Sequence, residues 1–220
     1  MHDDLVLVIG IVILAAVIIY YLFYSRAAVV KRKLREANQK KIGEFQEGET
    51  AKVIGKIKFA GKILKAPLSD RKCVYYHVLI EERRSHGKSS SWVDLIEEEK
   101  SGAVVIKDEN HYAFIETDLI KSYLIPDRQY NSGFMNNATP KLERFLNLHN
   151  KKSAWEIGLN KRIRYKEGVL EEGETIAVAG KGTWKKTSDL GLDIPSEKIL
   201  VIGSHDDEPV YLSDDPVTTK

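Results

Sequence analysis

Cysteine is almost absent from this chain of 220 residues, and its scarcity excludes several classes of protein. Cys73 stands alone, so no internal disulfide can form. A single thiol also excludes zinc ribbons, RING domains and every other site built from several cysteines. Cys73 begins an expected strand, and His77 lies about 13 Å further along it, too far to activate the thiol. We therefore expect Cys73 to be buried and unreactive.

Catalytic motifs are absent as well. None of the six histidines belongs to an H-x-x-x-H or H-E-x-x-H pair, and the chain has no G-x-S-x-G and no phosphate-binding loop. The acidic clusters at 206–208 and 214–215 lack the spacing and the glycine of a calcium loop. We therefore expect no catalytic residue, no metal and no cofactor, and a protein that is not itself an enzyme.

The net charge is also small, at +2, but the basic residues are unevenly spread. Residues 26–41 hold seven Lys or Arg residues against one Glu, a net charge of +6. Beside a membrane, each such cation contributes about 1 kcal/mol of attraction to anionic headgroups. The residues expected to make these lipid contacts are Arg26, Lys31, Arg32, Lys33 and Arg35. The remaining domain is slightly acidic, which does not suit a nucleic-acid partner.

One long apolar run is present near the N-terminus. From Leu5 to Tyr24 there is no charged residue, and a helix of that length spans roughly the 30 Å core of a bilayer. Aromatic and then basic residues follow it, whereas Asp3 and Asp4 precede it. The pattern predicts a single-pass transmembrane anchor over 1–25, with the N-terminus outside and the C-terminal domain in the cytoplasm. A cleaved signal peptide is the alternative, but its basic start and A-x-A-like site are missing.

A basic juxtamembrane helix is expected over 26–43, and β-type sequence follows it. Short runs of β-branched and aromatic residues alternate with turns, as in Thr50–Ile57, Cys73–Ile80 and Thr175–Lys181. Thr139 and Pro140 have the N-cap and first-position chemistry of a helix. We predict a mainly β (α+β) domain over 44–213, either a barrel or a sandwich. It would consist of two short β units, 44–126 and 160–213, with one intervening helix, and end in a tail over 214–220.

The two β units share a weak repeat. Residues 47–56 and 172–181 both read E-G-E-T-x-x-V-x-G-K. Chance is one explanation; the other is a pair of related β units, each opened by an E-G turn. In the second case Gly55 and Gly180 would mark a bulge or a tight bend in the middle of each strand.

Residues 63–76 read ILKAPLSDRKCVYY, and this run resembles the signature of the GIDE family. That family shares a "beside a membrane" (BAM) domain with mitochondrial E3 ubiquitin ligases of the MULAN type. Glycine-containing segments follow in the family's order, and the resemblance covers about residues 45–213. It implies a structural or binding role for Ala66, Pro67, Leu68, Cys73, Val74, Tyr75, Tyr76, Gly55, Gly102, Gly173 and Gly180.

The chain departs from that family in two ways. The family's ligases carry a zinc-binding RING and a second membrane span, and neither pattern is present in this sequence. The resemblance therefore implies the membrane-proximal domain without the catalytic part.

Three functions fit these observations. The first is a membrane-anchored, non-catalytic binding or scaffold domain with a membrane or cytoplasmic protein as its partner. The second is a divergent component of ubiquitin transfer that acts with a separate RING protein. The third is a sensor of lipid or of a small molecule at the membrane surface. Self-association into a homo-oligomer is compatible with each.

Overall fold

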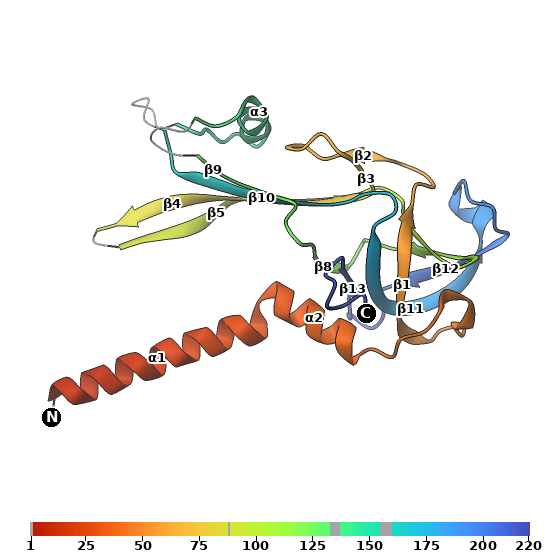
Figure 1. Ribbon diagram of the computed structural model, residues 1–220, viewed down its shortest axis with the longest axis horizontal. Coiled ribbons are helices and arrows are strands. Elements are labelled where there is room, and N and C mark those ends of the chain that lie inside the picture. The colour runs from red at the N-terminus through yellow and green to blue at the C-terminus, as the bar shows by residue number, and fades with distance from the viewer. Residues whose placement is uncertain (1, 88, 133–136, 155–159) are drawn as a thin grey trace.

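The computed structural model describes the chain except residues 1, 88, 133–136 and 155–159, and its centre is a closed barrel of five strands (Figure 1). In order around the barrel the strands are β1 (Thr50–Lys58), β6 (Val104–Asp108), β7 (His111–Ile115), β12 (Lys198–Gly203) and β11 (Thr175–Lys186), which pairs with β1. β7 and β12 are parallel, and the other neighbours are antiparallel. Numbered by their order in the chain, these five strands follow one another around the barrel as 1-2-3-5-4, the connectivity of the OB-type barrel. The domain is thus mainly β, with a barrel and not a sandwich.

Apolar residues at alternate positions fill the inside of the barrel. The side chains of Val53, Ile57, Ile106, Val178 and Ile202 are completely buried and pack in one cluster. This alternation follows from strand geometry, because successive side chains point to opposite faces. Two further strands continue the wall beyond β11: β13 (Val210–Ser213) pairs with β11, and β8 (Ile120–Tyr123) runs parallel to β13.

The two E-G-E-T repeats lie side by side in the barrel wall. β1 and β11 pair antiparallel, with Val53 opposite Val178 at the centre of the repeat. The hydrogen bonds on either side match: Gly48 N–H donates to Gly182 O (2.8 Å), and Gly173 N–H donates to Ile57 O (2.9 Å). Both turn glycines have positive φ, 75° and 89°. Both β units therefore contribute to one barrel, the first with three neighbouring strands and the second with two.

Gly55 and Gly180 lie in the middle of these strands, where the sequence predicted a bulge or a tight bend. The β1–β11 register has no shift, so neither glycine forms a bulge. A Cβ on Gly180 would lie 2.8 Å from Ile202 Cγ2, and one on Gly55 would lie 3.0 Å from Lys107 O. Glycine is required because neighbouring strands approach closely as the sheet closes.

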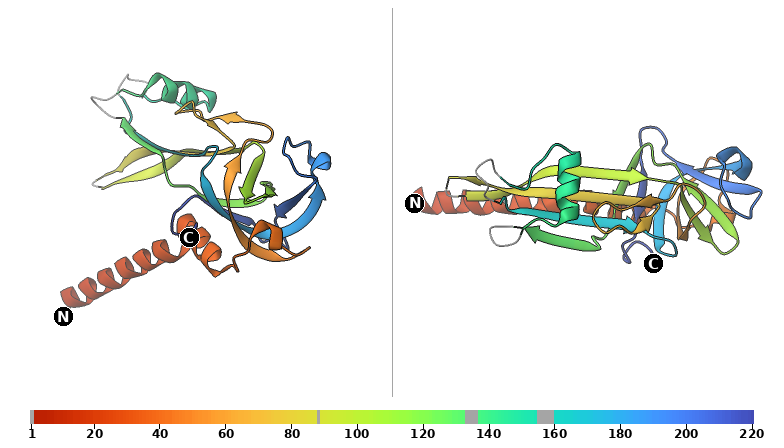
Figure 2. Two further views of the ribbon diagram at one scale, coloured as in Figure 1. Left: turned by 45° about the vertical axis from the view of Figure 1, so that its right-hand side comes forward. Right: turned by 90° about the horizontal axis from the view of Figure 1, so that it is seen from above.

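A four-stranded sheet extends from the barrel as an arm (Figures 1 and 2). Its strands, in spatial order, are β5 (Ser89–Ser101), β4 (Tyr75–His86), β10 (Ile163–Leu170) and β9 (Arg128–Ser132). Helix α3 (Pro140–Leu148) and the small hairpin of β2 (Leu64–Lys65) and β3 (Lys72–Cys73) cover one face and form a second hydrophobic core. As predicted, Thr139 caps α3: its side chain accepts a hydrogen bond from Leu142 N–H (3.2 Å).

Two helices precede the barrel: α1 (His2–Tyr24) and α2 (Arg26–Glu36). Ser25 separates them and caps α2, accepting a hydrogen bond from Ala28 N–H. α2 ends earlier than the predicted boundary at 43 because the chain becomes extended and joins the sheet. Lys40 N–H donates to Lys52 O (2.8 Å), and Lys52 N–H donates to Asn38 O (2.7 Å). A short 3-10 turn, η1 (Ile42–Glu44), then leads towards β1.

The predicted transmembrane anchor is not supported. Within the described part of the chain, no helix is long and apolar enough to cross a membrane. This finding overturns the transmembrane part of the predicted fold, the single-pass topology, and the placement of the N-terminus outside and of the domain in the cytoplasm.

Candidate binding groove

α2 packs against the outside of the barrel wall. Val30 and Leu34, one turn apart on the helix, are completely buried against Ala177, Ala179 and Tyr211. Their spacing places both side chains on one face of α2. This contact fixes the helix beside β11 and β13.

Ion pairs attach α2 to the domain along its length. Lys31 pairs with Asp215 (2.6 Å) and Lys33 with Glu208 (2.5 Å). Residues 215–218 form a turn in which Asp215 accepts hydrogen bonds from the backbone of the residues that follow it. The last residues of the chain therefore lie against α2.

Arg26 connects α2 with the arm. Its Nε donates to Ser122 O on β8 (2.7 Å), and its guanidinium pairs with Glu97 (3.1 Å) and Glu99 on β5. Ser122 also accepts a hydrogen bond from the Tyr75 hydroxyl (3.1 Å). Arg26 therefore hydrogen-bonds to β8, which is the edge strand of its sheet.

The five basic residues predicted to meet lipid have different environments. Arg26, Lys31 and Lys33 pair with carboxylates of the domain, as described above. Arg32 Nη1 donates to Phe23 O (3.2 Å), and Arg35 is exposed. Much of the positive charge of this segment is therefore balanced within the molecule.

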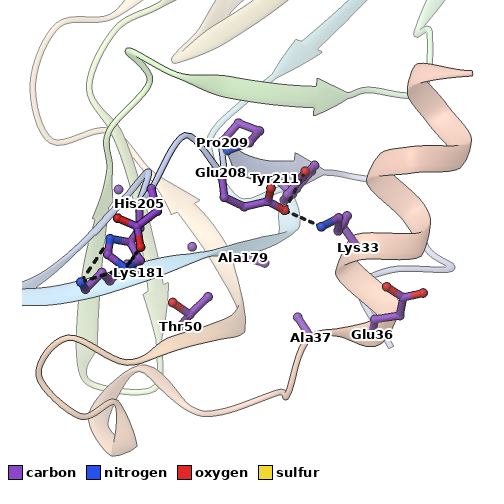
Figure 3. Close-up of a pocket in the computed structure, with 13 residues that line it drawn as sticks. Lys33, Glu36, Ala37, Thr50, Ala179, Lys181, His205, Glu208, Pro209 and Tyr211 are labelled. Atoms are coloured by element: carbon purple, nitrogen blue, oxygen red, sulfur yellow. Dashed lines mark hydrogen bonds and ion pairs between the residues drawn. The ribbon is translucent and has the colours of Figure 1, made fainter. Parts of the chain in front are cut away.

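A groove of about 460 Å³ lies where the C-terminal end of α2, β11 and the loop 204–209 meet (Figure 3). Small residues form much of its lining: Ala37, Ala179, Gly180, Gly203 and Pro209. The groove opens at the seam where the partner of β11 changes from β13 to β12. Large side chains are excluded from this seam by the close packing of the strands around Gly180.

One wall of the groove is formed by Lys33, Glu208 and Tyr211. The carboxylate of Glu208 accepts hydrogen bonds from Lys33 Nζ (2.5 Å) and from the Tyr211 hydroxyl (3.0 Å). The hydrogen bond from Lys33 lowers the pKa of Glu208, and the same bond raises the pKa of Lys33. Burial, followed by the nearby Glu208, raises the pKa of Tyr211. This wall is a preformed, internally paired surface.

The opposite wall is formed by a tight hairpin and Lys181. His205 and Glu208 exchange backbone hydrogen bonds (3.1 and 2.8 Å), and Asp206 and Asp207 between them both have positive φ. His205 Nε2 lies 2.8 Å from Asp206 Oδ2, and Lys181 Nζ lies 3.2 Å from His205 Nδ1. The structure gives Lys181 no carboxylate partner among the residues it describes.

These groups can bind a ligand, but they do not form a catalytic constellation. No group of three or more His, Cys, Asp or Glu side chains in the described regions could hold a metal ion. Glu36 lies at the other end of the groove from Lys181 (Figure 3) and has no hydrogen bond or ion pair with any described residue. Among the described residues, the groove therefore presents a lysine without a carboxylate partner and a glutamate without an ion pair, over a floor of small residues.

Several of the residues on which the family resemblance rests lie away from the groove, in the second core. Ala66, Leu68 and Cys73 are buried there, and Leu68 N–H donates to the buried carboxylate of Glu167 (2.8 Å). Cys73 is buried, as predicted, and burial raises its pKa to about 11, which disfavours the reactive thiolate form. Pro67 is half-buried in the same hairpin.

The other residues of this motif also contribute to packing or to the conformation of the backbone. Val74 and Tyr75 pack in the barrel core, whereas Tyr76 points to the second core and donates to Glu98 (2.5 Å). A Cβ on Gly102 would collide with Lys62 O. Gly173 supplies the positive φ of its turn.

Of the predicted site residues, only Gly180 and Lys33 line the groove. Lys181, His205, Glu208 and Tyr211 were not predicted. A local signal exists for the hairpin, since two Asp residues between short β-type runs favour a tight turn. The approach of Lys33 to Glu208, residues far apart in sequence, carries no local signal.

Comparison of the chain with models of protein families, with curated proteins and with solved structures finds no significant match. The resemblance to the GIDE family therefore stays a prediction.

Proposed function

We propose that this protein is a non-catalytic binding module that holds a short, extended segment of another polypeptide in the groove between α2 and the barrel. The observation that carries the proposal is the placement of Lys181 and Glu36, neither of which has an ion pair with a described residue of opposite charge, at opposite ends of a floor of small residues. Clefts with a few convergent polar groups are the usual location of binding sites.

The chemistry of the groove favours a peptide. Ala37, Ala179 and Pro209 line the groove with short side chains, which leaves room for the backbone of an extended ligand. Lys181 would receive an acidic side chain of the partner, and Glu36 a basic one. The fixed contact of α2 with the barrel means that the groove is preformed, which lowers the entropic cost of binding.

The other two functions have weaker support. Ubiquitin transfer with a separate RING partner rests on the family resemblance alone. A lipid sensor requires free cations on 26–41, and three of the five expected cations pair with domain carboxylates.

The test is a selection of peptides from a random display library on the purified full chain. We expect enriched peptides that contain one acidic and one basic residue and bind in the groove. Lys181→Glu should weaken the selected peptides at least about tenfold in Kd, because the contact with the acidic residue becomes repulsive. A peptide with that acidic residue changed to Lys should recover binding to Lys181→Glu.

The matched control is Lys151→Glu, which makes the same charge change at an exposed lysine outside the groove. A photocrosslinker at Thr50, which is exposed and lines the groove, then identifies the natural partner in cells. The captured segment must itself bind with the same dependence on Lys181. Peptides that bind Lys181→Glu and the parent chain equally well would disprove the proposal.

A further inference from the structure

A second cavity lies at the opposite end of the β11–β12 pair. The loop 187–197 begins with a 3-10 turn, η2 (Thr187–Leu190), and folds back on the outside of the barrel. Its Leu190, Leu192 and Ile194 pack against a cluster that contains Val105 and Ile199. A backbone hydrogen bond from Thr187 N–H to Glu197 O joins the two ends of the loop, and one from Asp193 N–H to Ala60 O holds its middle (3.0 Å each). The loop is thus a packed part of the fold, and a cavity of about 480 Å³ lies within it.

Two unpaired cations line this cavity. Lys186 and Lys198 are direct partners in the register of β11 and β12. Side chains opposite each other in an antiparallel pair lie about 5 Å apart at Cβ, and like charges there repel. Within the described chain neither lysine has a carboxylate partner. An anion between them would remove the repulsion.

Thr187 provides a second, independent observation. It lines the same cavity, is 95% buried by its 5% relative exposure, and its Oγ1 has no hydrogen-bond partner within the described structure. Buried hydroxyl groups without partners are rare, because burial removes their bonds to water. The hydroxyl is therefore available as a donor to a ligand.

We propose that this cavity binds the phosphate group of a small phosphomonoester, or inorganic phosphate. The two ammonium groups and the Thr187 hydroxyl are donors suited to a compact oxyanion. Ser188 and Ser196 also line the cavity, but their hydroxyls already donate, to Asp189 (3.1 Å) and to Lys198 O (2.6 Å). Glu197 also lines the cavity, and its carboxylate would disfavour a second anionic group on the ligand.

This site is separate from the groove. The pair Lys186–Lys198 is five residues along β11 from the pair Lys181–Gly203, which is about 17 Å of strand. Phosphate binding therefore does not depend on the proposed function, and the variants that test one leave the other unchanged.

The experiment is titration calorimetry of the full chain with inorganic phosphate and with glycerol 3-phosphate, at ionic strength held constant with NaCl. We expect saturable binding of phosphate that Thr187→Val weakens about tenfold and Thr187→Ser restores, because Ser keeps the hydroxyl. Lys186→Gln with Lys198→Gln should abolish binding, and these exposed positions leave the fold intact. Tighter binding of glycerol 3-phosphate assigns the ester as the ligand, and equal binding assigns free phosphate.

The matched control is Lys151→Gln with Lys152→Gln, two exposed lysines away from the cavity. It removes the same charge and should leave binding unchanged. The proposal is overturned if neither phosphate compound binds, if the control pair weakens binding as much as the cavity pair, or if Thr187→Val binds like the parent chain.

Discussion

The two E-G-E-T units have the same backbone and opposite electrostatic environments. In each, the second Glu accepts a hydrogen bond from the N–H three residues before it: Gln46 to Glu49 (3.2 Å) and Glu171 to Glu174 (3.0 Å). Lys40 beside Glu49 lowers the pKa of that carboxyl. Burial raises the pKa of Glu174, and the neighbouring acidic groups raise it further. The local sequence determines the turn, whereas distant segments determine the charge state of the same residue.

The largest expected difference between the units concerns the mid-strand glycines. Gly180→Ala should cost about 3 kcal/mol of unfolding free energy, because the new Cβ lies 2.8 Å from Ile202 Cγ2 and 2.9 Å from Gly203 O. Gly55→Ala meets its nearest atom at 3.0 Å and should cost about 1 kcal/mol. Urea unfolding of both variants measures the difference. Equal losses would mean that the two strands tolerate crowding alike.

Asp214, which lies near the second unit, should make the stability of the protein depend on pH. Burial raises the pKa of Asp214 to about 7, so the folded state holds a proton that the unfolded state loses at lower pH. Stability from this group is full below its ordinary pKa and is lost as the pH rises through about 7. Asp214→Asn keeps an oxygen for Ile125 N–H (2.8 Å in the parent chain).

Asp214→Asn should therefore be more stable than the parent chain at pH 8 by about 2 kcal/mol, with the advantage gone at pH 4. Thermal unfolding across this range measures it. Glu49→Gln, in the first unit, serves as the control because it lacks this dependence near pH 7. If the difference in stability between the parent chain and Asp214→Asn did not change with pH, burial could not be raising the pKa of Asp214.

The turn glycines should behave alike in the two units. Gly48→Ala and Gly173→Ala place a Cβ at φ 75° and 89° with no atom within 3.4 Å, so strain of the backbone is the main cost. We expect about 1 kcal/mol for each, equal within a few tenths. The test is denaturant unfolding of the two variants side by side. Unequal losses would show that the turns differ despite their matched hydrogen bonds.

The smallest expected effect is a pair of opposite changes in stability when the second Glu of each unit is replaced by Gln. Glu174→Gln should stabilise the protein at pH 7 by about 0.5 kcal/mol, since a raised pKa means that the charged form is disfavoured in the fold. Glu49→Gln should lower the melting temperature slightly, since a lowered pKa means that the charged form is favoured. Below the ordinary pKa of Glu both differences should shrink. If both variants changed stability in the same direction, the two glutamates would not have opposite electrostatic environments.

These contrasts show which parts of the structure the sequence could predict. The Thr139 cap and the repeated turns depend on residues close in sequence, and the burial of Cys73 follows from the residue type; each was predicted. Of the bulge or tight bend predicted at Gly55 and Gly180, the register excludes the bulge, and the glycines serve contacts with other strands.

The candidate groove could not be predicted for the same reason. Its walls join residues of α2 with residues near the end of the chain, as in the pair of Lys33 and Glu208. The transmembrane prediction relied on one apolar run and on the residues at its flanks, and no helix in the described part of the chain is long and apolar enough to cross a membrane. Hydrophobic periodicity and turn residues identify individual helices and strands, but they do not predict which of these pack against each other.

The pairing of β1 with β11 has a consequence for the order of folding. β1 is made early in synthesis, whereas Val178, which lies opposite Val53, follows only after the whole arm has been made. Contacts between segments so far apart in sequence form slowly, because a long loop must close first. Until the second E-G-E-T unit leaves the ribosome, one edge of β1 has no partner along its length. The second unit is therefore the part of the nascent chain whose arrival completes the barrel and protects that edge.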